Sequence, residues 1–522
     1  MREFDLIIRN GTVIDGTGRP GFAGDVAVSD GVIRHVGALP DDSHAPRELD
    51  AAALVVSPGF IDIHTHADIS LQAHPEHLPK IMQGVTTEIF TNCGLGFAPV
   101  TDDGMRIQRE YLSGLFGPDE GVDWAWRSVA QFLARFERRG TAANLGYLIP
   151  HGAVKVSVMG MDARPATGAE KDAMVAMVRQ GMEEGAWGLS TGLWYAPMRS
   201  ADRDETVRLC SEAGFFATHQ RDYEDELFAA TEESLAIADE AGVPVQIAHL
   251  QFNGEINRGR APELLSRLDR ARESGTDVTW DSYPYLAGST LVQAMLPEWA
   301  TAGGPGAILD RLHQPEDRAR ILEALANCGR GWDRTRLSGA QSSVNRPFEG
   351  ESFDRIAAVR GLTVPEFICA LIEEDHLQAC FVYHNAHESD LRAALRHPAQ
   401  MVGSDGIHIP GKCHPRLYGT FPRVLGRYAR DEKTLSLEEA VRKMTAAPAG
   451  RIGLADRGLL APGKAADIVI FNPAEVTDTA TYEDPLQFPR GIPYVFVNGI
   501  SVKWAGEPTH ALPGRVLRRP SP

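Results

Sequence analysis

The stretch that decides the fold is Pro58-Gly59-Phe60-Ile61-Asp62-Ile63-His64-Thr65-His66. Its apolar residues are typical of a buried strand, and two histidines stand at the carboxyl end of that strand. Residues two apart on a strand point to the same side, so His64 and His66 can face one cation together. The stretch therefore predicts a buried strand that ends at a metal-type site.

Seven further short apolar runs follow this one, and segments with helical spacing separate them. Such alternation indicates repeated βα units and a parallel sheet, and eight is the number of strands that closes a barrel. We therefore expect an α/β fold, a (β/α)8 TIM barrel. The eight expected strands are Gly59–His64, Thr86–Thr91, Asn144–Ile149, Trp187–Thr191, Phe215–His219, Val245–His249, Val278–Ser282 and Met401–Ser404.

The segments between the strands carry helix signals, and one of them is unusually long. Glu170–Glu184 and Glu226–Ala241 have apolar residues at helical spacing, and Gly242 follows the second. More than a hundred residues separate the seventh and eighth strands, which is too many for a simple crossover. We expect an inserted lid at about residues 287–400, with a helix over Ala307–Leu325 among its elements.

Both ends of the chain are rich in short β-type runs followed by turn dipeptides. The dipeptides are Asn10-Gly11, Asp30-Gly31 and Asn498-Gly499, which are hairpin signals. The two ends are expected to pair into one small β-domain, and two separate hairpins are the alternative. The expected division is 1–57 for the first part of this domain, 58–455 for the barrel and 456–522 for its second part.

Composition excludes several classes of function. Hydrophobic residues make up 43% of the 522 residues and charged ones 23%, as in ordinary globular proteins. The net charge of −18 repels phosphate backbones and anionic lipid, so we expect neither nucleic acid nor a membrane as partner. The first twenty residues lack a signal-peptide core and the six cysteines lack paired spacing, which predicts a cytoplasmic protein with reduced thiols. The oligomeric state stays open.

Metal-type side chains end five of the eight expected strands, at the rim where barrels assemble their active sites. A lone cysteine after a strand is usually a buried apolar residue, and a lone histidine is usually structural. Their joint occurrence at matching positions is what predicts a metal site. The candidate ligands are His64, His66, Cys93, His219, His249 and Asp405.

Several motifs resemble a known family. His64-Thr65-His66 and Ser404-Asp405-Gly406 are similar to the amidohydrolase superfamily. Within it, the chain resembles the N-acyl-D-amino-acid deacylases (D-aminoacylases) nearly from end to end. The motifs that carry this second resemblance are Thr91-Asn92-Cys93-Gly94, Gly188-Leu189-Ser190-Thr191-Gly192-Leu193, Asp281-Ser282-Tyr283-Pro284-Tyr285, His414-Pro415-Arg416 and Gly419-Thr420-Phe421-Pro422-Arg423. The resemblance implies a (β/α)8 barrel with a β-sandwich and an inserted lid.

The resemblance also implies a zinc site in which a cysteine on the second strand replaces a bridging lysine. Cys93 stands at that place, and with His219 and His249 it leaves a fourth zinc position for water. Zinc-bound hydroxide would then attack an amide carbonyl, with Asp405 as general base and acid. His64 and His66 either hold a second, weaker metal together with Asp405 or support that carboxylate by hydrogen bonds.

The expected substrate is an N-acyl-D-amino acid, a small-molecule amide with a free carboxylate. Arg416 matches the family's carboxylate-binding arginine, and Tyr195, Tyr283 and Ser289 match pocket residues. Gln251 stands where the family usually has a lysine, and glutamine supplies no charge. A cyclic or neutral amide is therefore the alternative substrate. A binding protein without turnover is the alternative from another class.

Overall fold

The computed structural model describes residues 3–117, 119, 121–409 and 411–520. Parallel strands form a closed ring at its centre, because each pairs with the next along the chain and β18 returns to β6. The third strand is interrupted at Leu148 and the eighth at residues 403–405. The ring consists of β6 (Phe60–His66), β7 (Val85–Phe90), β8 (Asn144–Tyr147) with β9 (Ile149–Pro150), β10 (Leu189–Gly192), β11 (Phe216–His219), β12 (Val245–Ile247), β13 (Val278–Ser282), and β17 (Gln400–Val402) with β18 (Gly406–Ile407).

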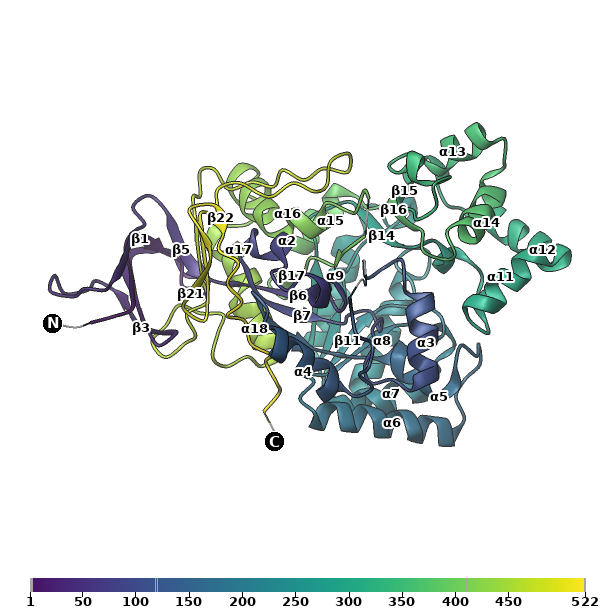
Figure 1. Cartoon of the computed structure of the whole chain (residues 1–522), viewed down its shortest axis with the longest axis horizontal. Coiled ribbons are helices and arrows are strands. Elements are labelled where there is room, and N and C mark those ends of the chain that lie inside the picture. The colour runs from purple at the N-terminus through teal and green to yellow at the C-terminus, as the bar shows by residue number, and fades with distance from the viewer. Residues whose placement is uncertain (1–2, 118, 120, 410, 521–522) are drawn as a thin grey trace.

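Each of the eight expected strands overlaps one strand of this ring, and helices cover its outer face (Figure 1). The helix expected at Glu170 is α6. It starts with a capping box, in which Thr167 and Glu170 exchange hydrogen bonds with each other's backbone N–H. The helix expected at Glu226 is α8, which ends at Gly242 with φ +67°. The covering helices are α1 (Ser70–Ala73), α2 (Leu78–Ile81), α3 (Asp102–Tyr111), α4 (Val129–Arg139), α5 (His151–Met159), α6 (Gly168–Glu183), α7 (Arg203–Ala213), α8 (Leu227–Ala241), α9 (Ala261–Glu273), α15 (Glu388–Arg396), α16 (Arg416–Arg423), α17 (Leu437–Met444) and α18 (Ala446–Ile452).

The segment between β13 and β17 has its own small sheet and helices, which lie at the end of the molecule opposite the chain's first strands (Figure 1). The sheet is antiparallel in the order β14-β16-β15. Gly288 of β14 pairs with Tyr383 of β16, and Thr290 with Phe381. The elements are β14 (Ala287–Leu291), α10 (Glu298–Thr301), α11 (Pro305–His313), α12 (Pro315–Ala326), β15 (Thr335–Gly339), α13 (Phe353–Arg360), α14 (Val364–Glu374) and β16 (Cys380–His384).

The prediction of a single helix over Ala307–Leu325 is wrong. The chain forms two helices there, α11 and α12, and Gln314 between them is extended, with φ −86° and ψ 121°. Pro315 is the cause, because proline has no N–H to donate to the preceding turn and drives the residue before it out of the helical region.

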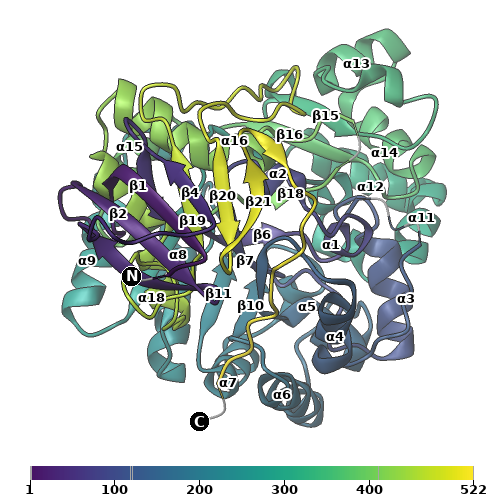
Figure 2. The same cartoon turned by 60° about the vertical axis from the view of Figure 1, so that its left-hand side comes forward.

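Strands from both ends of the chain form one nine-stranded sheet, in which β19 pairs antiparallel with β5 (Figure 2). Side chains such as Ile8, Val26, Ile468 and Phe496 are buried together in one apolar cluster. The strands are β1 (Leu6–Val13), β2 (Phe22–Ser29), β3 (Val32–Gly37), β4 (Arg47–Asp50), β5 (Val55–Pro58), β19 (Ile468–Phe471), β20 (Tyr494–Val497), β21 (Ile500–Trp504) and β22 (Glu507–Pro508).

Two of the three turn dipeptides make hairpins. Asp30-Gly31 and Asn498-Gly499 join consecutive strands, and all four residues have positive φ, between 49° and 80°. Asn10-Gly11 is different, and its prediction as a hairpin turn is wrong. It lies inside β1, where the pairing with β2 shifts register and Asn10 has φ 61°. A Cβ on Gly11 would meet Val56 Cγ2 at 2.5 Å, so this glycine allows a close approach within the sheet.

Of the helices that the structure describes, none combines the length and the apolar character required to cross a bilayer.

Candidate metal centre and substrate pocket

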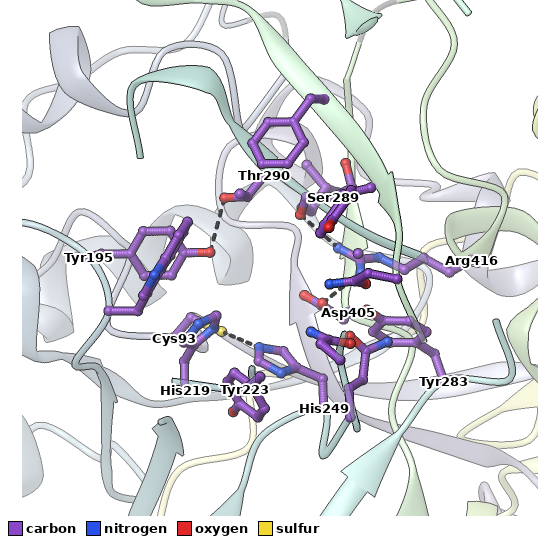
Figure 3. A pocket seen from close by; sticks show the side chains of 18 of the residues that line it. Cys93, Tyr195, His219, Tyr223, His249, Tyr283, Ser289, Thr290, Asp405 and Arg416 are labelled. Carbon is purple, nitrogen blue, oxygen red and sulfur yellow. Dashed lines mark hydrogen bonds and ion pairs between the residues drawn. The ribbon is translucent and has the colours of Figure 1, made fainter. Parts of the chain in front are cut away.

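Two overlapping groups of metal-type side chains meet at the carboxyl ends of the ring strands. One consists of Cys93, His219 and His249, and the other joins Cys93 to His64, His66 and Asp405. Within each group the candidate ligand atoms lie within 4.8 Å of one another. Cys93 Sγ is 3.5 Å from His249 Nε2 (Figure 3). It is also 3.4 Å from His64 Nε2. Cys93 therefore belongs to both groups and stands between them.

Three of these residues have unusual backbone conformations. Cys93, His249 and Asp405 have φ of 57°, 34° and 50°, in the left-handed region that residues with a Cβ seldom adopt. Each comes within three residues of the end of a strand, at the rim of the ring. A Cβ on Gly192 would meet the Cys93 carbonyl oxygen at 2.2 Å. Packing of this kind holds Cys93 in a strained conformation, which is typical of functional sites.

Asp281, at the end of β13, links the two groups. Its Oδ1 accepts hydrogen bonds from His64 Nδ1 at 3.0 Å and from the backbone N–H of His249 at 2.8 Å. Burial alone would lower the pKa of His64, but the negative charges of Asp281 and Asp405 raise it well above its usual value. Asp281 stood within a family motif, but its position beneath two candidate ligands follows only from the fold.

Asp405 lies between two histidines and an arginine. Its Oδ1 is 3.1 Å from His66 Nε2 and 3.4 Å from His64 Nε2, and its Oδ2 is 2.8 Å from an Arg416 nitrogen. Burial favours the neutral carboxyl, but Arg416 and His64 outweigh it and hold the pKa of Asp405 well below its usual range. Asp405 is therefore a carboxylate at neutral pH.

A buried ion pair between Asp62 and Lys80 fixes the backbone of His64 and of Ser404, the residue before Asp405. Asp62 Oδ1 accepts from the backbone N–H groups of Ser404 at 2.9 Å and His64 at 3.2 Å. Its Oδ2 accepts from the Ser404 hydroxyl at 2.5 Å and from Lys80 Nζ at 2.6 Å. No pattern in the sequence pointed to Lys80, which reaches the centre from α2 on the outside of the ring.

We expect Lys80→Met to lower the free energy of unfolding by about 3–5 kcal/mol, because it leaves the Asp62 carboxylate buried without a counter-charge. The measurement is the midpoint of urea unfolding at an unchanged m-value. The double variant Asp62→Asn/Lys80→Met is the control, and it should recover part of the loss because neither charge remains. A loss below about 1 kcal/mol in Lys80→Met would contradict the role of the pair.

The donor set fits a zinc-like cation. Burial lowers the pKa of His219 well below its usual value and that of His249 to about 4, so both imidazoles keep a free lone pair at neutral pH. Among the described residues, the buried Nδ1 atoms of His66 and His219 have no hydrogen-bond partner. Burial raises the pKa of the Cys93 thiol to about 11, so a cation is the charge that would favour its thiolate. One sulfur and two imidazoles are ligands that zinc prefers.

The second group opens onto the same cavity as the first. This cavity has a volume of about 190 Å³. Tyr195 donates to or accepts from Thr290 at 3.0 Å, and the Arg416 guanidinium lies 4.5 Å from the centre of the Tyr283 ring (Figure 3). The structure brings to its wall all the residues expected to bind substrate, which are Tyr195, Gln251, Tyr283, Ser289 and Arg416.

Tyr223 also lines this cavity, although no motif in the sequence pointed to it. Its hydroxyl donates to the Ala248 carbonyl at 2.8 Å and accepts from the Gln220 N–H at 3.0 Å. Its ring centre is 5.0 Å from that of His219 and 5.1 Å from that of His249. Tyr223 therefore packs beside both imidazoles and helps to position them.

The buried Lys155 belongs to neither donor group. Lys155 is buried in α5 and pairs with Glu205 at 2.7 Å. Its ammonium is therefore already neutralised by a carboxylate outside the cavity.

Known proteins resemble this chain over nearly its whole length. A model described as "Amidohydrolase family" matches residues 47–502. An N-acyl-D-aspartate deacylase of Alcaligenes xylosoxydans xylosoxydans is 37% identical over 524 residues, which cover 99% of this chain and 95% of the relative. A crystal structure of D-aminoacylase has a TM-score of 0.84 at 36% identity, covering 99% of this chain and 100% of that one. An N-acyl-D-glutamate deacylase from Bordetella bronchiseptica, complexed with zinc and a phosphonate inhibitor, has a TM-score of 0.83 at 32% identity, with the same coverage of both chains.

Proposed function

The chain belongs to the amidohydrolase family and is a metal-dependent hydrolase of C–N bonds other than peptide bonds, and from this premise we propose that it removes the acyl group from N-acyl-D-amino acids. The observation that carries the proposal is the meeting of Cys93, His219, His249 and Asp405 at one cavity whose wall contains Arg416. Relatives named for deacylation of D-amino acids support it, since they match the chain at 36–37% identity over 99% of its length.

Cys93, His219 and His249 would hold one zinc ion, because their donor atoms converge and suit that metal. When bound, the ion polarises a carbonyl and makes water more acidic. His64, His66 and Asp405 form either a second, weaker metal site or a hydrogen-bonded support for the carboxylate. The hydrogen bond from His66 to Asp405 supports the second role, because it already orients the carboxylate towards the cavity.

Asp405 would move the proton. An amide has a poor leaving group, because its nitrogen must be protonated as the tetrahedral intermediate collapses. The Asp405 carboxylate, which stays ionised beside Arg416, accepts a proton from the attacking water and returns it to that nitrogen. The same Arg416 contact holds the carboxylate in one orientation, which favours transfer over a short distance.

Arg416, Tyr283, Tyr195 and Ser289 would bind the substrate carboxylate and its surroundings. The Ser289 hydroxyl is buried without a partner among the described residues, so it can donate to a substrate oxygen. Gln251 favours the alternative, an amidohydrolase that acts on a cyclic or neutral amide, because it offers an amide in place of a cation.

The ring corresponds in this proposal to a (β/α)8 barrel over residues 58–455, with a lid at about 287–400. The small β-domain, a β-sandwich in the family, would combine 1–57 and 456–522, of which residues 1–2 and 521–522 lie outside the described part of the chain. The continuous sheet from β3 to β22 supports this division, because it includes strands from both ends.

A panel of N-acetyl-D- and N-acetyl-L-amino acids tests the proposal. We expect free amine from the D-enantiomers, with kcat/KM at least about 100-fold higher than for the L-enantiomers, because a stereocentre fixed at several points costs a few kcal/mol when inverted. Hydantoin-like cyclic amides are included in the same assay. Efficient ring opening without release from any D-substrate would replace the proposed substrate by the alternative.

A further inference from the structure

Arg330 is a cation in the cavity wall that forms no ion pair with any described residue. It belongs to the inserted segment, between α12 and β15. Its guanidinium carbon lies 4.6 Å from the centre of the Tyr383 ring and 5.6 Å from that of Phe381. Within the described part of the chain no carboxylate approaches it to 4.0 Å, and no acceptor takes a hydrogen bond from it. The aromatic rings therefore hold Arg330 in place while its N–H groups stay available.

The carboxylates and the second arginine of the wall each have a hydrogen-bond or ion-pair partner within the protein. Arg416 lies 2.8 Å from Asp405 and donates to the Ser289 carbonyl at 3.3 Å. Asp222 accepts from the backbone N–H of Glu224 at 2.5 Å, and Glu224 accepts from the Asn385 amide at 2.9 Å. Arg330 is therefore the wall's best candidate for binding an anion that arrives with the substrate.

The antiparallel pair of strands β14 and β16 leads from the reacting centre towards Arg330. Gly288 and Tyr383 are directly paired across it, so they share one face of the small sheet. A Cβ on Gly288 would point into space bounded at 3.9 Å by Gln251 Oε1 and the Tyr283 hydroxyl. Because glycine has no side chain, a substrate group can cross this position between the Tyr283 side of the cavity and Tyr383, against which Arg330 is stacked.

We propose that Arg330 binds a carboxylate on the substrate's own side chain, so that the preferred substrates are N-acyl derivatives of acidic D-amino acids. The inference rests on the proposed function and adds the side-chain class to it. The α-carboxylate stays with Arg416, Tyr283 and Ser289, and the second carboxylate lies beyond Gly288 at Arg330. A planar guanidinium that offers two parallel N–H groups suits a carboxylate better than it suits a neutral amide.

The test compares substrates of nearly equal shape and different charge. For the wild type, kcat/KM should be at least about 10-fold higher for N-acetyl-D-glutamate and N-acetyl-D-aspartate than for N-acetyl-D-glutamine and N-acetyl-D-asparagine. Arg330→Met should lower kcat/KM for the acidic pair by about 10- to 100-fold and change it for the amide pair by less than about 3-fold. For the acidic pair, kcat/KM of Arg330→Lys should lie between that of the wild type and that of Arg330→Met.

Arg320→Met is the matched control. Arg320 lies in the same inserted segment and stacks on Trp299 at 4.0 Å, but it does not line the cavity. Arg320→Met should therefore leave kcat/KM unchanged for all four substrates. The inference would be overturned if Arg330→Met lowered kcat/KM equally for acidic and amide substrates, or if the wild type cleaved both pairs equally well. In either case, turnover of the N-acetyl-D-substrates would still support the proposed function. A wild type that cleaves none of the four would overturn the inference, and the remaining D-amino acids of the panel would then decide the proposed function separately.

Discussion

Asp405→Asn should lower kcat by a factor on the order of 10² to 10⁴, with little change in zinc content, because it removes the proton carrier and keeps the shape of the side chain. The carboxylate is ionised between Arg416 and two histidines, so the wild type can accept a proton at neutral pH. An asparagine at the same place can do neither half of the transfer. Cys93, His219 and His249 remain, so the first donor group stays complete.

The measurement is kcat on the best N-acetyl-D-substrate, together with elemental analysis and a circular dichroism spectrum of the same sample. Asp68→Asn is the matched control. Asp68 is a buried carboxyl near the same rim that accepts from Thr91 at 2.7 Å and does not line the cavity. Burial raises its pKa to about 7, so an amide there resembles a form that the wild type already populates. If Asp405→Asn keeps kcat within tenfold of the wild type, Asp405 is not the proton carrier.

Cys93→Ala should weaken zinc binding by at least about 100-fold and abolish most turnover at ordinary zinc concentrations. The reason is that the thiolate is the charged member of a group otherwise composed of two neutral imidazoles. His249→Ala should likewise weaken zinc binding and lower turnover. Zinc retained after dialysis, measured by elemental analysis, reports the loss directly, and turnover recovered by excess zinc would show that the fold is intact.

Cys210→Ala is the control for Cys93→Ala. Cys210 is a buried cysteine of α7 that belongs to neither donor group, so its loss should leave the zinc content unchanged. Full zinc occupancy in both Cys93→Ala and His249→Ala would refute the assignment of the tight site.

Local patterns in the sequence determined much of this chain. Apolar runs set the eight strands, and the residues at or just after the ends of these runs placed Cys93, His219, His249 and Asp405 at one rim before any distance was known. Side chains alternate between the two faces of a strand, and barrel active sites lie at the carboxyl ends of the strands. Both rules depend only on neighbouring residues and on the order of the strands, so they can be applied to the sequence alone. The error at Pro315 was also local, since a proline in that position already forbids one continuous helix.

Only the tertiary structure decided which of these residues act together. Asp62 clamps Ser404, 342 residues away, and Asp281 supports His64 across 217 residues. Arg330 meets the cavity because Tyr383 pairs with Gly288 across two strands that are far apart in the chain, a pairing that the sequence did not predict. Contacts of this kind depend on loop closure and packing between distant segments, and no periodicity in the chain encodes them. The sequence by itself therefore determined the strands and the chemistry at their ends, and the closed ring decided how those side chains face one another and what else shares their cavity.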